Sequence, residues 1–445
     1  MDDDAPDSSR QASRVPSGRL SRLLQLGTTA GRMAAGGAAE KLKRLAQRAE
    51  AELPHALLTA KNATLLAERL SRLRGAAMKV GQMLSMEGDN LLPPEFAKAL
   101  EILRSSAHRM PDSQVKEVLV REYGKDYAAR FGSLDLRPMA SASIGQVHRA
   151  TTLEGDALAL KIQYPGVAES IDSDVDNLRS LLALTRLAPS GLNLDALTQE
   201  VKDELRREVN YARELELLVA YRAAVADHPG VRIPRAYPEL STSRILALEL
   251  VPGLPLLTWS KTADQASRDR VGRLLLELLM RELFEYGLMQ TDPNPANYFY
   301  DPAAEQLVLL DFGATRTVPP ETRALYRRAF RGIAGRDELL LTSVLTELGV
   351  DSAEAPEAMR ILISIALEAA HAFDPGVYDF RASTLSERLN TKSKQLAQYR
   401  KSLRPPPPAY LFFQRKLGGT YLLCRNLGAR VDCRAVLEEF GLLGE

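Results

Sequence analysis

Two motifs, Asp292-x4-Asn297 and Asp311-Phe312-Gly313, constrain this chain more than any other feature of its sequence. The second motif begins fourteen residues after Asn297 and follows the apolar run 307–310, which predicts a strand. Phosphoryl transfer from ATP uses one carboxylate to position the nucleophile, and an amide oxygen with a second carboxylate to hold Mg²⁺ against the phosphates. We therefore predict Asp292 as a catalytic residue and Asn297 and Asp311 as magnesium ligands. The alternative is a turn that carries two solvated aspartates.

Lys161 stands inside an apolar strand candidate, 16 positions after Gly145. That separation suits a hairpin that runs from a phosphate loop to the lysine that holds ATP phosphates. A lysine in such a run needs a carboxylate, because an unpaired buried charge is costly. The candidates on the predicted helix 194–222 are Glu208, Glu214 and Glu216. We predict that Lys161 is catalytic and pairs with Glu214, with Glu208 as another active-site acid; the alternative is a snorkelling lysine at a sheet edge.

The stretch "MASASIGQVHRA" is similar to a phosphate loop of the form G-x-G-x-x-G-x-V. Gly145 and Val147 match that form, while Ala140 and Ala142 stand in place of the other two glycines. Glycine permits positive φ and close approach to phosphate, whereas an alanine forced into the left-handed region costs about 1–2 kcal/mol. We expect a stiffer loop that still binds phosphate through Ser143 and backbone N–H groups. The predicted nucleotide-binding residues are Ala140, Ala142, Ser143, Gly145, Val147, Lys161, Glu208, Glu214 and Glu249.

The sequence also departs from that of a protein kinase around the acidic motifs. Gln290-Thr291-Asp292 stands where a protein kinase has His-Arg-Asp, and Asn294 replaces the lysine that protein-Ser/Thr kinases use near the transferred phosphate. After Gly313, "ATRTVPPE" runs directly into a helix-like pattern. The sequence predicts no long activation segment and hence no platform for a peptide, so we infer that protein phosphorylation is not the main activity.

The predicted elements are helical, then strand-rich, then helical again, which indicates an α+β chain. Helical patterns cover 112–122, 168–186, 194–222, 262–287 and 320–350, and strand candidates are 157–162 and 243–253. The segment "YFYDPAAEQLVLLDFG" predicts a hairpin. The predicted parts are a flexible, basic, amphipathic segment (1–50), a helical extension (51–112), a first lobe with the alanine-rich loop (113–252) and a helical second lobe (253–445).

Net charge and hydropathy exclude several classes of protein. The formal net charge of +1 gives no electrostatic case for binding nucleic acid. Apolar stretches are interrupted before the ~18 residues of a transmembrane helix, and the acidic start "MDDDAPDSS" argues against a targeting peptide. We expect a cytoplasmic protein that is peripheral on the inner membrane surface if residues 20–50 form a basic amphipathic helix; a loosely packed helix or linker is the alternative. Cys424 and Cys433 are expected to be buried free thiols.

Taken together, these residues resemble the UbiB/AarF atypical kinases, which include the eukaryotic ADCK proteins of coenzyme Q synthesis. The resemblance runs from about residue 65 to the C-terminus. Its marks are "KVGQ" at 79–82, "ASASIGQVH", "ALKIQYPGV", the acidic helix with Glu208, "QTDPNPANYFYDP" and "LLDFGATR". One departure is Glu208-Val209-Asn210, where the family pattern is Glu-x-Asp, so that one charge is lost.

The resemblance implies a protein-kinase-like bilobal fold with an N-terminal helical KxGQ extension over the active site. Lys79 would then lie near Glu208 and Asp311 as a further catalytic residue; without the family pattern it reads as a helix-surface lysine. The resemblance also implies ATP and Mg²⁺ as cofactors, ATPase activity and a role in ubiquinone synthesis. The implied partners are isoprenoid or quinone-precursor lipids and quinone-biosynthesis proteins. The alternatives are a small-molecule phosphotransferase and a non-catalytic kinase-like scaffold.

Overall fold

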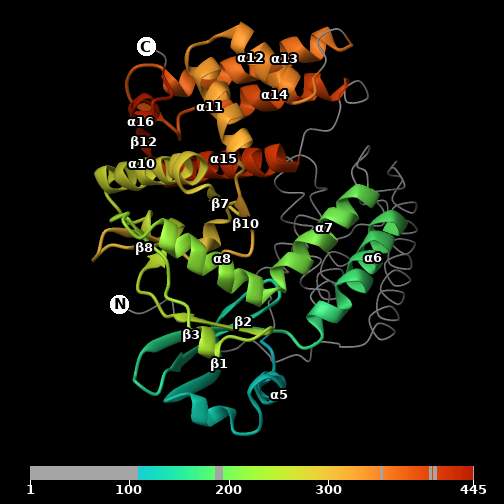
Figure 1. Ribbon diagram of the computed structural model, residues 1–445, viewed down its shortest axis with the longest axis vertical. Helices are drawn as coiled ribbons and strands as arrows, with labels where there is room; N and C mark the ends of the chain where they lie inside the picture. Colours follow the sequence, from blue (N-terminus) through green and yellow to red (C-terminus); the bar gives the residue numbers. More distant parts are fainter. Residues whose placement is uncertain (1–108, 186–193, 351–353, 400–402, 404–407, 444–445) are drawn as a thin grey trace, which may run out of the picture. The chain divides into compact units, whose positions relative to one another are not determined.

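The computed structural model in Figure 1 describes residues 109–185, 194–350, 354–399, 403 and 408–443. The chain divides into two compact units, Met1–Glu216 with Arg235–Leu250, and Leu217–Pro234 with Val251–Glu445. The predicted segment 1–50 and most of the predicted extension 51–112, including Lys79, lie outside the described residues.

A four-stranded antiparallel sheet forms the centre of the first unit. Its order is β1-β2-β3-β5, built from β1 (Ser133–Ser141), β2 (Gly145–Thr151), β3 (Ala157–Gln163) and β5 (Ile245–Glu249). Leu158, Leu160 and Ile162 of β3 are fully buried, because every second residue of a strand faces the same side. They share a core with α5 (Asp112–Tyr123). The strands predicted at 157–162 and within 243–253 are therefore confirmed.

The helical segment after β3 is broken where the sequence predicted continuity. It consists of α6 (Val167–Thr185), α7 (Leu194–Glu208) and α8 (Tyr211–Ala224), so the single helix predicted over 194–222 is wrong. The physical reason is a new helix start at Asn210, whose side chain accepts a hydrogen bond from the Arg213 backbone N–H at 3.0 Å. This is the N-cap interaction that asparagine favours. Glu208 and Glu214 therefore lie on different helices.

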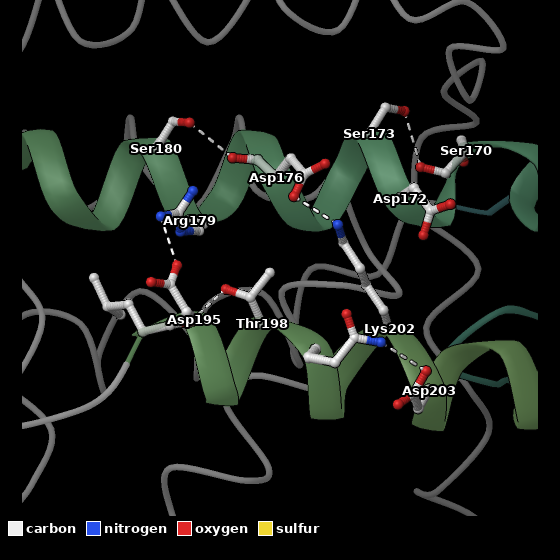
Figure 2. A network of polar contacts seen from close by, with 12 residues as sticks. Ser170, Asp172, Ser173, Asp176, Arg179, Ser180, Asp195, Thr198, Lys202 and Asp203 are labelled. Carbon is white, nitrogen blue, oxygen red and sulfur yellow. Dashed lines mark hydrogen bonds and ion pairs between the residues drawn. The ribbon is translucent and has the colours of Figure 1, made fainter.

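Figure 2 shows α6 and α7 side by side, with ion pairs between them. Lys202 Nζ lies 2.7 Å from Asp176 Oδ1, and Arg179 Nη2 lies 2.6 Å from Asp195 Oδ1. Surface pairs of this kind contribute less than about 1 kcal/mol each. They link the two helices and do not by themselves indicate a binding site.

The second unit combines short strands with helices (Figure 1). One sheet has the order β4-β9-β8-β6, and β10 pairs with β7 in another. The strands are β4 (Val231–Arg232), β6 (Leu254–Pro255), β7 (Leu288–Gln290), β8 (Tyr298–Asp301), β9 (Gln306–Leu309) and β10 (Thr315–Thr317). The predicted hairpin is present as the antiparallel pair of β8 and β9.

The helices of this unit are α9 (Leu256–Trp259), α10 (Gln265–Arg281), α11 (Pro320–Ala334), α12 (Glu338–Glu347), α13 (Pro356–Ala370), α14 (Leu385–Ala397), α15 (Pro408–Leu427) and α16 (Cys433–Glu439). The pattern predicted as one helix over 320–350 forms two helices, because the chain turns at Arg336, which has a φ of 51°. A single π-helical turn, Glu282–Tyr286, continues α10 and ends at Gly287. Cys424 and Cys433 are buried free thiols, as expected. None of the described helices has the length and apolar character needed to cross a membrane.

Candidate active site

The predicted lysine–glutamate pair is present in the first unit. Lys161 Nζ lies 3.1 and 3.2 Å from the two carboxylate oxygens of Glu214, on α8. Only 12% of the Lys161 side chain and 1% of the Glu214 side chain are exposed, and the Tyr211 ring centre lies 5.1 Å from the ammonium. The predicted partner of Lys161 is therefore confirmed. The pair holds the ammonium on the face of β3 opposite its buried leucines.

The alanine-rich loop is a tight turn between β1 and β2. Ala142 donates its backbone N–H to the Gly145 carbonyl at 2.9 Å, and Ala140 pairs with Val147 across the two strands. Neither alanine is among the described residues with a positive φ. The left-handed strain considered from the sequence therefore does not arise, and the turn accommodates both methyl groups with ordinary backbone geometry.

Gly145 is required by close packing between strands. A Cβ atom at this position would meet the Ile162 carbonyl oxygen at 2.3 Å, far inside ordinary contact distance. In the same strand pair Val147 lies directly opposite Lys161. The register therefore brings the predicted loop residues on β2 next to the predicted phosphate-binding lysine.

Other predicted nucleotide-binding residues also have partners in the first unit. The Ser143 hydroxyl donates a hydrogen bond to the Glu208 carboxylate. Glu249, the last residue of β5, accepts a hydrogen bond from the Arg235 backbone N–H at 3.0 Å. Contact of these side chains with a nucleotide stays a prediction.

In the second unit, Asp292 and Asn297 face each other across a short loop between β7 and β8. The Asn297 side-chain amide donates from Nδ2 to Asp292 Oδ2 at 2.9 Å. The loop is held by Asn294, whose side chain accepts from the Ala296 backbone N–H at 3.1 Å and so begins the 3₁₀ turn Pro295–Asn297. The spacing of the motif thus accommodates this capped turn, which brings Asn297 back to Asp292.

The acid of the second motif is tied to the same loop through Gln290. Gln290 Nε2 lies 2.8 Å from the Asp292 carbonyl oxygen and 3.3 Å from the Asp311 carbonyl oxygen, and donates to both. Asp311 Oδ1 in turn accepts from the Gly313 backbone N–H at 3.1 Å. Phe312 is fully buried and its ring centre lies 5.0 Å from that of Tyr221. The structure therefore brings the two acidic motifs together.

The side chains of Asn297 and Asp311 fit a magnesium site. Because Asn297 donates through Nδ2, its Oδ1 is the atom presented for a metal. One amide and one carboxylate oxygen suit Mg²⁺, which keeps several waters and takes phosphate oxygens as its remaining ligands. In the part of the chain that the structure describes, His, Cys, Asp and Glu side chains form no cluster of three or more that could hold a metal alone.

Sequence reasoning missed two basic residues of α15. Arg415 Nη2 donates to Asp292 Oδ1 at 3.3 Å, and Lys416 forms an ion pair with Glu282. No motif spacing links a helix 123 residues away to the loop 291–297, which we call the catalytic loop because it carries the predicted catalytic residue Asp292. The available signal was composition, since "LFFQRKLGGTYLLC" places two adjacent cations inside a mostly apolar stretch.

Comparison with known proteins gives a family model, close relatives and a solved structure. The model described as ABC1 atypical kinase-like domain matches residues 102–345. The chain is 37% identical to the atypical kinase COQ8B, mitochondrial, of Rattus norvegicus, over 96% of this chain and 81% of that protein. It is 32% identical to the atypical kinase COQ8, mitochondrial, of Saccharomyces cerevisiae, over 96% of this chain and 86% of that protein. The solved Rv3197–erythromycin complex from Mycobacterium tuberculosis aligns with a TM-score of 0.58 and 26% identity, over 86% of this chain and 97% of that one.

Proposed function

The chain belongs to the family of ABC1 atypical kinase-like proteins, and from this premise we propose that it binds Mg-ATP and cleaves the terminal phosphate in support of isoprenoid quinone synthesis. The family match also confirms the predicted kinase-like α+β fold. The observation that carries the proposal is the single Gln290 amide that joins the carbonyls of Asp292 and Asp311. Two acidic motifs held in this way are what phosphoryl transfer requires.

Each proposed role follows from a described contact. Lys161, fixed by Glu214, holds the α- and β-phosphates of ATP. Asn297 Oδ1 and Asp311 hold magnesium, which when bound neutralises charge on the phosphate oxygens. Asp292 orients the attacking oxygen, and Arg415 beside it supplies positive charge where a protein kinase has a lysine. The order of these motifs and the family match support their action on one nucleotide.

Water or a small molecule is the proposed phosphoryl acceptor. Six residues, 314–319, separate Gly313 from the first residue of α11, and part of that segment is β10. This is too short for an activation segment that binds a peptide. The same shortness favours the second candidate, a small-molecule phosphotransferase. Incubation with ATP labelled in its terminal phosphate and a metabolite extract distinguishes an ATPase from a phosphotransferase. An ATPase releases the label only as inorganic phosphate, whereas a phosphotransferase transfers it to another compound.

The quinone role rests on the relatives and on one cavity. The relatives from rat and yeast are named atypical kinases COQ8B and COQ8. In the second unit, a cavity of about 190 Å³ is lined by apolar and aromatic side chains that include Met289, Val318, Tyr326, Phe412 and Phe413, and by Thr291 next to Asp292. An apolar cavity of this kind fits part of a lipid-like ligand. Contact with a membrane surface is proposed from the basic amphipathic pattern of residues 20–50.

The proposal is tested by ATP hydrolysis with purified protein and with Asp311→Asn. We expect slow Mg²⁺-dependent hydrolysis that rises on addition of liposomes, and loss of hydrolysis in the variant. Equal hydrolysis by both proteins would contradict the assignment of Asp311. No binding of Mg-ATP by the wild-type protein would favour the third possibility, a non-catalytic scaffold. Deletion of the gene, with quinone measurement and complementation by each form, tests the role in the pathway.

A further inference from the structure

Lys416 and Glu282 form a fully buried ion pair that the proposed chemistry does not use. Their exposed fractions are 2% and 0%, and Lys416 Nζ lies 2.8 Å from Glu282 Oε2. Burial lowers the pKa of Lys416, but the nearby Glu282 and Tyr298 raise it by more, so this pKa lies above its usual value and the ammonium stays charged. Removal of two charges from water is expensive, and apolar residues of similar volume are often at least as stabilising. Stability alone therefore does not explain the pair.

The second oxygen of Glu282 is used to hold neighbouring groups. Glu282 Oε1 accepts from the Tyr221 hydroxyl at 2.8 Å and from the Gln290 backbone N–H at 2.9 Å. Glu282 belongs to the π-helical turn after α10, while Gln290 ends β7 and immediately precedes the catalytic loop. The carboxylate thus fixes the point at which the catalytic loop leaves the sheet.

Lys416 also reaches the side chain of Gln290 through Tyr298. Lys416 Nζ donates to the Tyr298 hydroxyl at 3.4 Å, and this hydroxyl donates to Gln290 Oε1 at 3.2 Å. Because Oε1 accepts this bond, the Gln290 amide is held with Nε2 toward the Asp292 and Asp311 carbonyls. A continuous path of contacts therefore leads from α15 to both acidic motifs, entirely within the second unit.

We propose that Lys416, Glu282 and Tyr298 are positioning residues that act through Gln290 to set the separation of the Asp292 and Asp311 backbones, and with it the separation of their carboxylates. None of the three touches the nucleotide in this proposal, which rests on the proposed function. An error of about 1 Å in the placement of catalytic groups costs roughly a hundredfold in rate. The rate of phosphate release should therefore be more sensitive to this network than the affinity for ATP is.

The test compares two tyrosine variants on the same strand. Tyr298→Phe removes the hydroxyl that orients Gln290, whereas Tyr300→Phe removes a hydroxyl that interacts with Arg270 instead. Both side chains are buried, with exposed fractions of 1% and 4%, and the control ring packs on Trp259 at 4.2 Å. For Tyr298→Phe we expect kcat to fall about tenfold and the Mg²⁺ concentration for half-maximal ATP-dependent stabilisation to rise severalfold, with the ATP Kd unchanged within about twofold. Tyr300→Phe should match the wild type in all three quantities.

The outcomes separate this inference from the proposed function. If both variants lose the same thermal stability and keep wild-type kcat and Mg²⁺ dependence, the network is only structural and the inference is overturned. If the wild type binds Mg-ATP but does not turn it over, the deciding quantity is the Mg²⁺ concentration for half-maximal ATP-dependent stabilisation. A higher value in Tyr298→Phe supports the inference, and an unchanged value overturns it. If the wild type binds no Mg-ATP, the proposed function and this inference both fail.

A second pair of variants isolates the buried charge. Lys416→Met leaves Glu282 unpaired and is expected to unfold readily. Lys416→Met with Glu282→Gln removes both charges and keeps an oxygen for the Gln290 N–H and the Tyr221 hydroxyl. We expect this double variant to fold and to bind ATP, with kcat reduced about as much as in Tyr298→Phe. Wild-type kcat in the double variant would overturn the role given to Lys416.

Discussion

At the scale of single residues, the decisive interaction is the ion pair of Lys161 and Glu214. The carboxylate is almost completely buried and contacts the ammonium through both oxygens. Loss of one partner leaves the other as an uncompensated charge away from water, which costs far more than the pair contributes when intact. Any change that moves the ammonium away from Glu214 therefore also lowers the stability of the first unit.

Lys161→Met is expected to lower the free energy of unfolding by about 3–5 kcal/mol, because Glu214 remains buried without its partner. The double variant with Glu214→Met removes both charges and should recover most of that loss. Neither variant should show stabilisation by Mg-ATP, which for the wild type reaches about 2.7 kcal/mol at a ligand concentration of 100 Kd. Urea denaturation with and without Mg-ATP measures both effects. Stabilisation of the double variant by Mg-ATP would contradict the role of Lys161.

Asn210 gives a second prediction at this scale. Its side chain caps α8, and asparagine and aspartate are equally good caps. Asn210→Ala should lower the free energy of unfolding by about 1 kcal/mol, while Asn210→Asp should change it by less than about 0.5 kcal/mol. Denaturant titration of the two variants checks this. A large gain in ATP hydrolysis in Asn210→Asp would instead show that the charge lost here serves the active site.

At the scale of elements, α15 packs so closely against the catalytic loop that one of its positions has room only for glycine. A Cβ atom on Gly419 would lie 2.0 Å from Cγ of Pro293, which follows Asp292 in the loop. The proline ring has little freedom to move away. The adjacent Gly418 is exposed, and a Cβ atom there would meet nothing within 4 Å.

These two neighbouring glycines form a matched pair for mutation. Gly419→Ala should displace the catalytic loop, reduce kcat for ATP hydrolysis by about tenfold or more, and destabilise the protein by about 1–3 kcal/mol. Gly418→Ala lies in the same helix without a clash, so it should raise the free energy of unfolding by about 1 kcal/mol and leave kcat unchanged. Steady-state kinetics and denaturant titration of both variants provide the test. Equal kcat in the two variants would show that this contact does not position the loop.

Elements differ in how far the sequence predicts them. The strand around Lys161 was predictable because large apolar residues alternate with Lys161 and small residues along it. The β8–β9 hairpin was predictable because a polar turn separates two apolar runs. The break between α7 and α8 was not, because the helical pattern continues through Asn210 and only the capping geometry reveals the new start. The approach of α15 to the catalytic loop depends on tertiary packing, which no local pattern encodes.

At the scale of the whole molecule, the order of motifs predicted which residues share a unit. Lys161, Glu214 and the alanine-rich loop fall in the first unit, and Asp292, Asn297 and Asp311 in the second. The sequence named these residues correctly as neighbours within each unit, but it did not reveal that Gly145 is also required by close strand packing. It did not reveal the network of Lys416, Glu282 and Tyr298, because its members are far apart in the chain.

The central proposal is that Lys161, Asn297 and Asp311 bind one Mg-bound nucleotide. The most direct test is a crystal structure of the full chain with Mg²⁺ and a non-hydrolysable ATP analogue. We predict Lys161 Nζ within hydrogen-bond distance of the α- or β-phosphate, and a magnesium ion about 2.0–2.1 Å from Asn297 Oδ1 and an Asp311 oxygen. A nucleotide bound to other residues, or a magnesium ion whose ligands include neither Asn297 nor Asp311, would contradict the account.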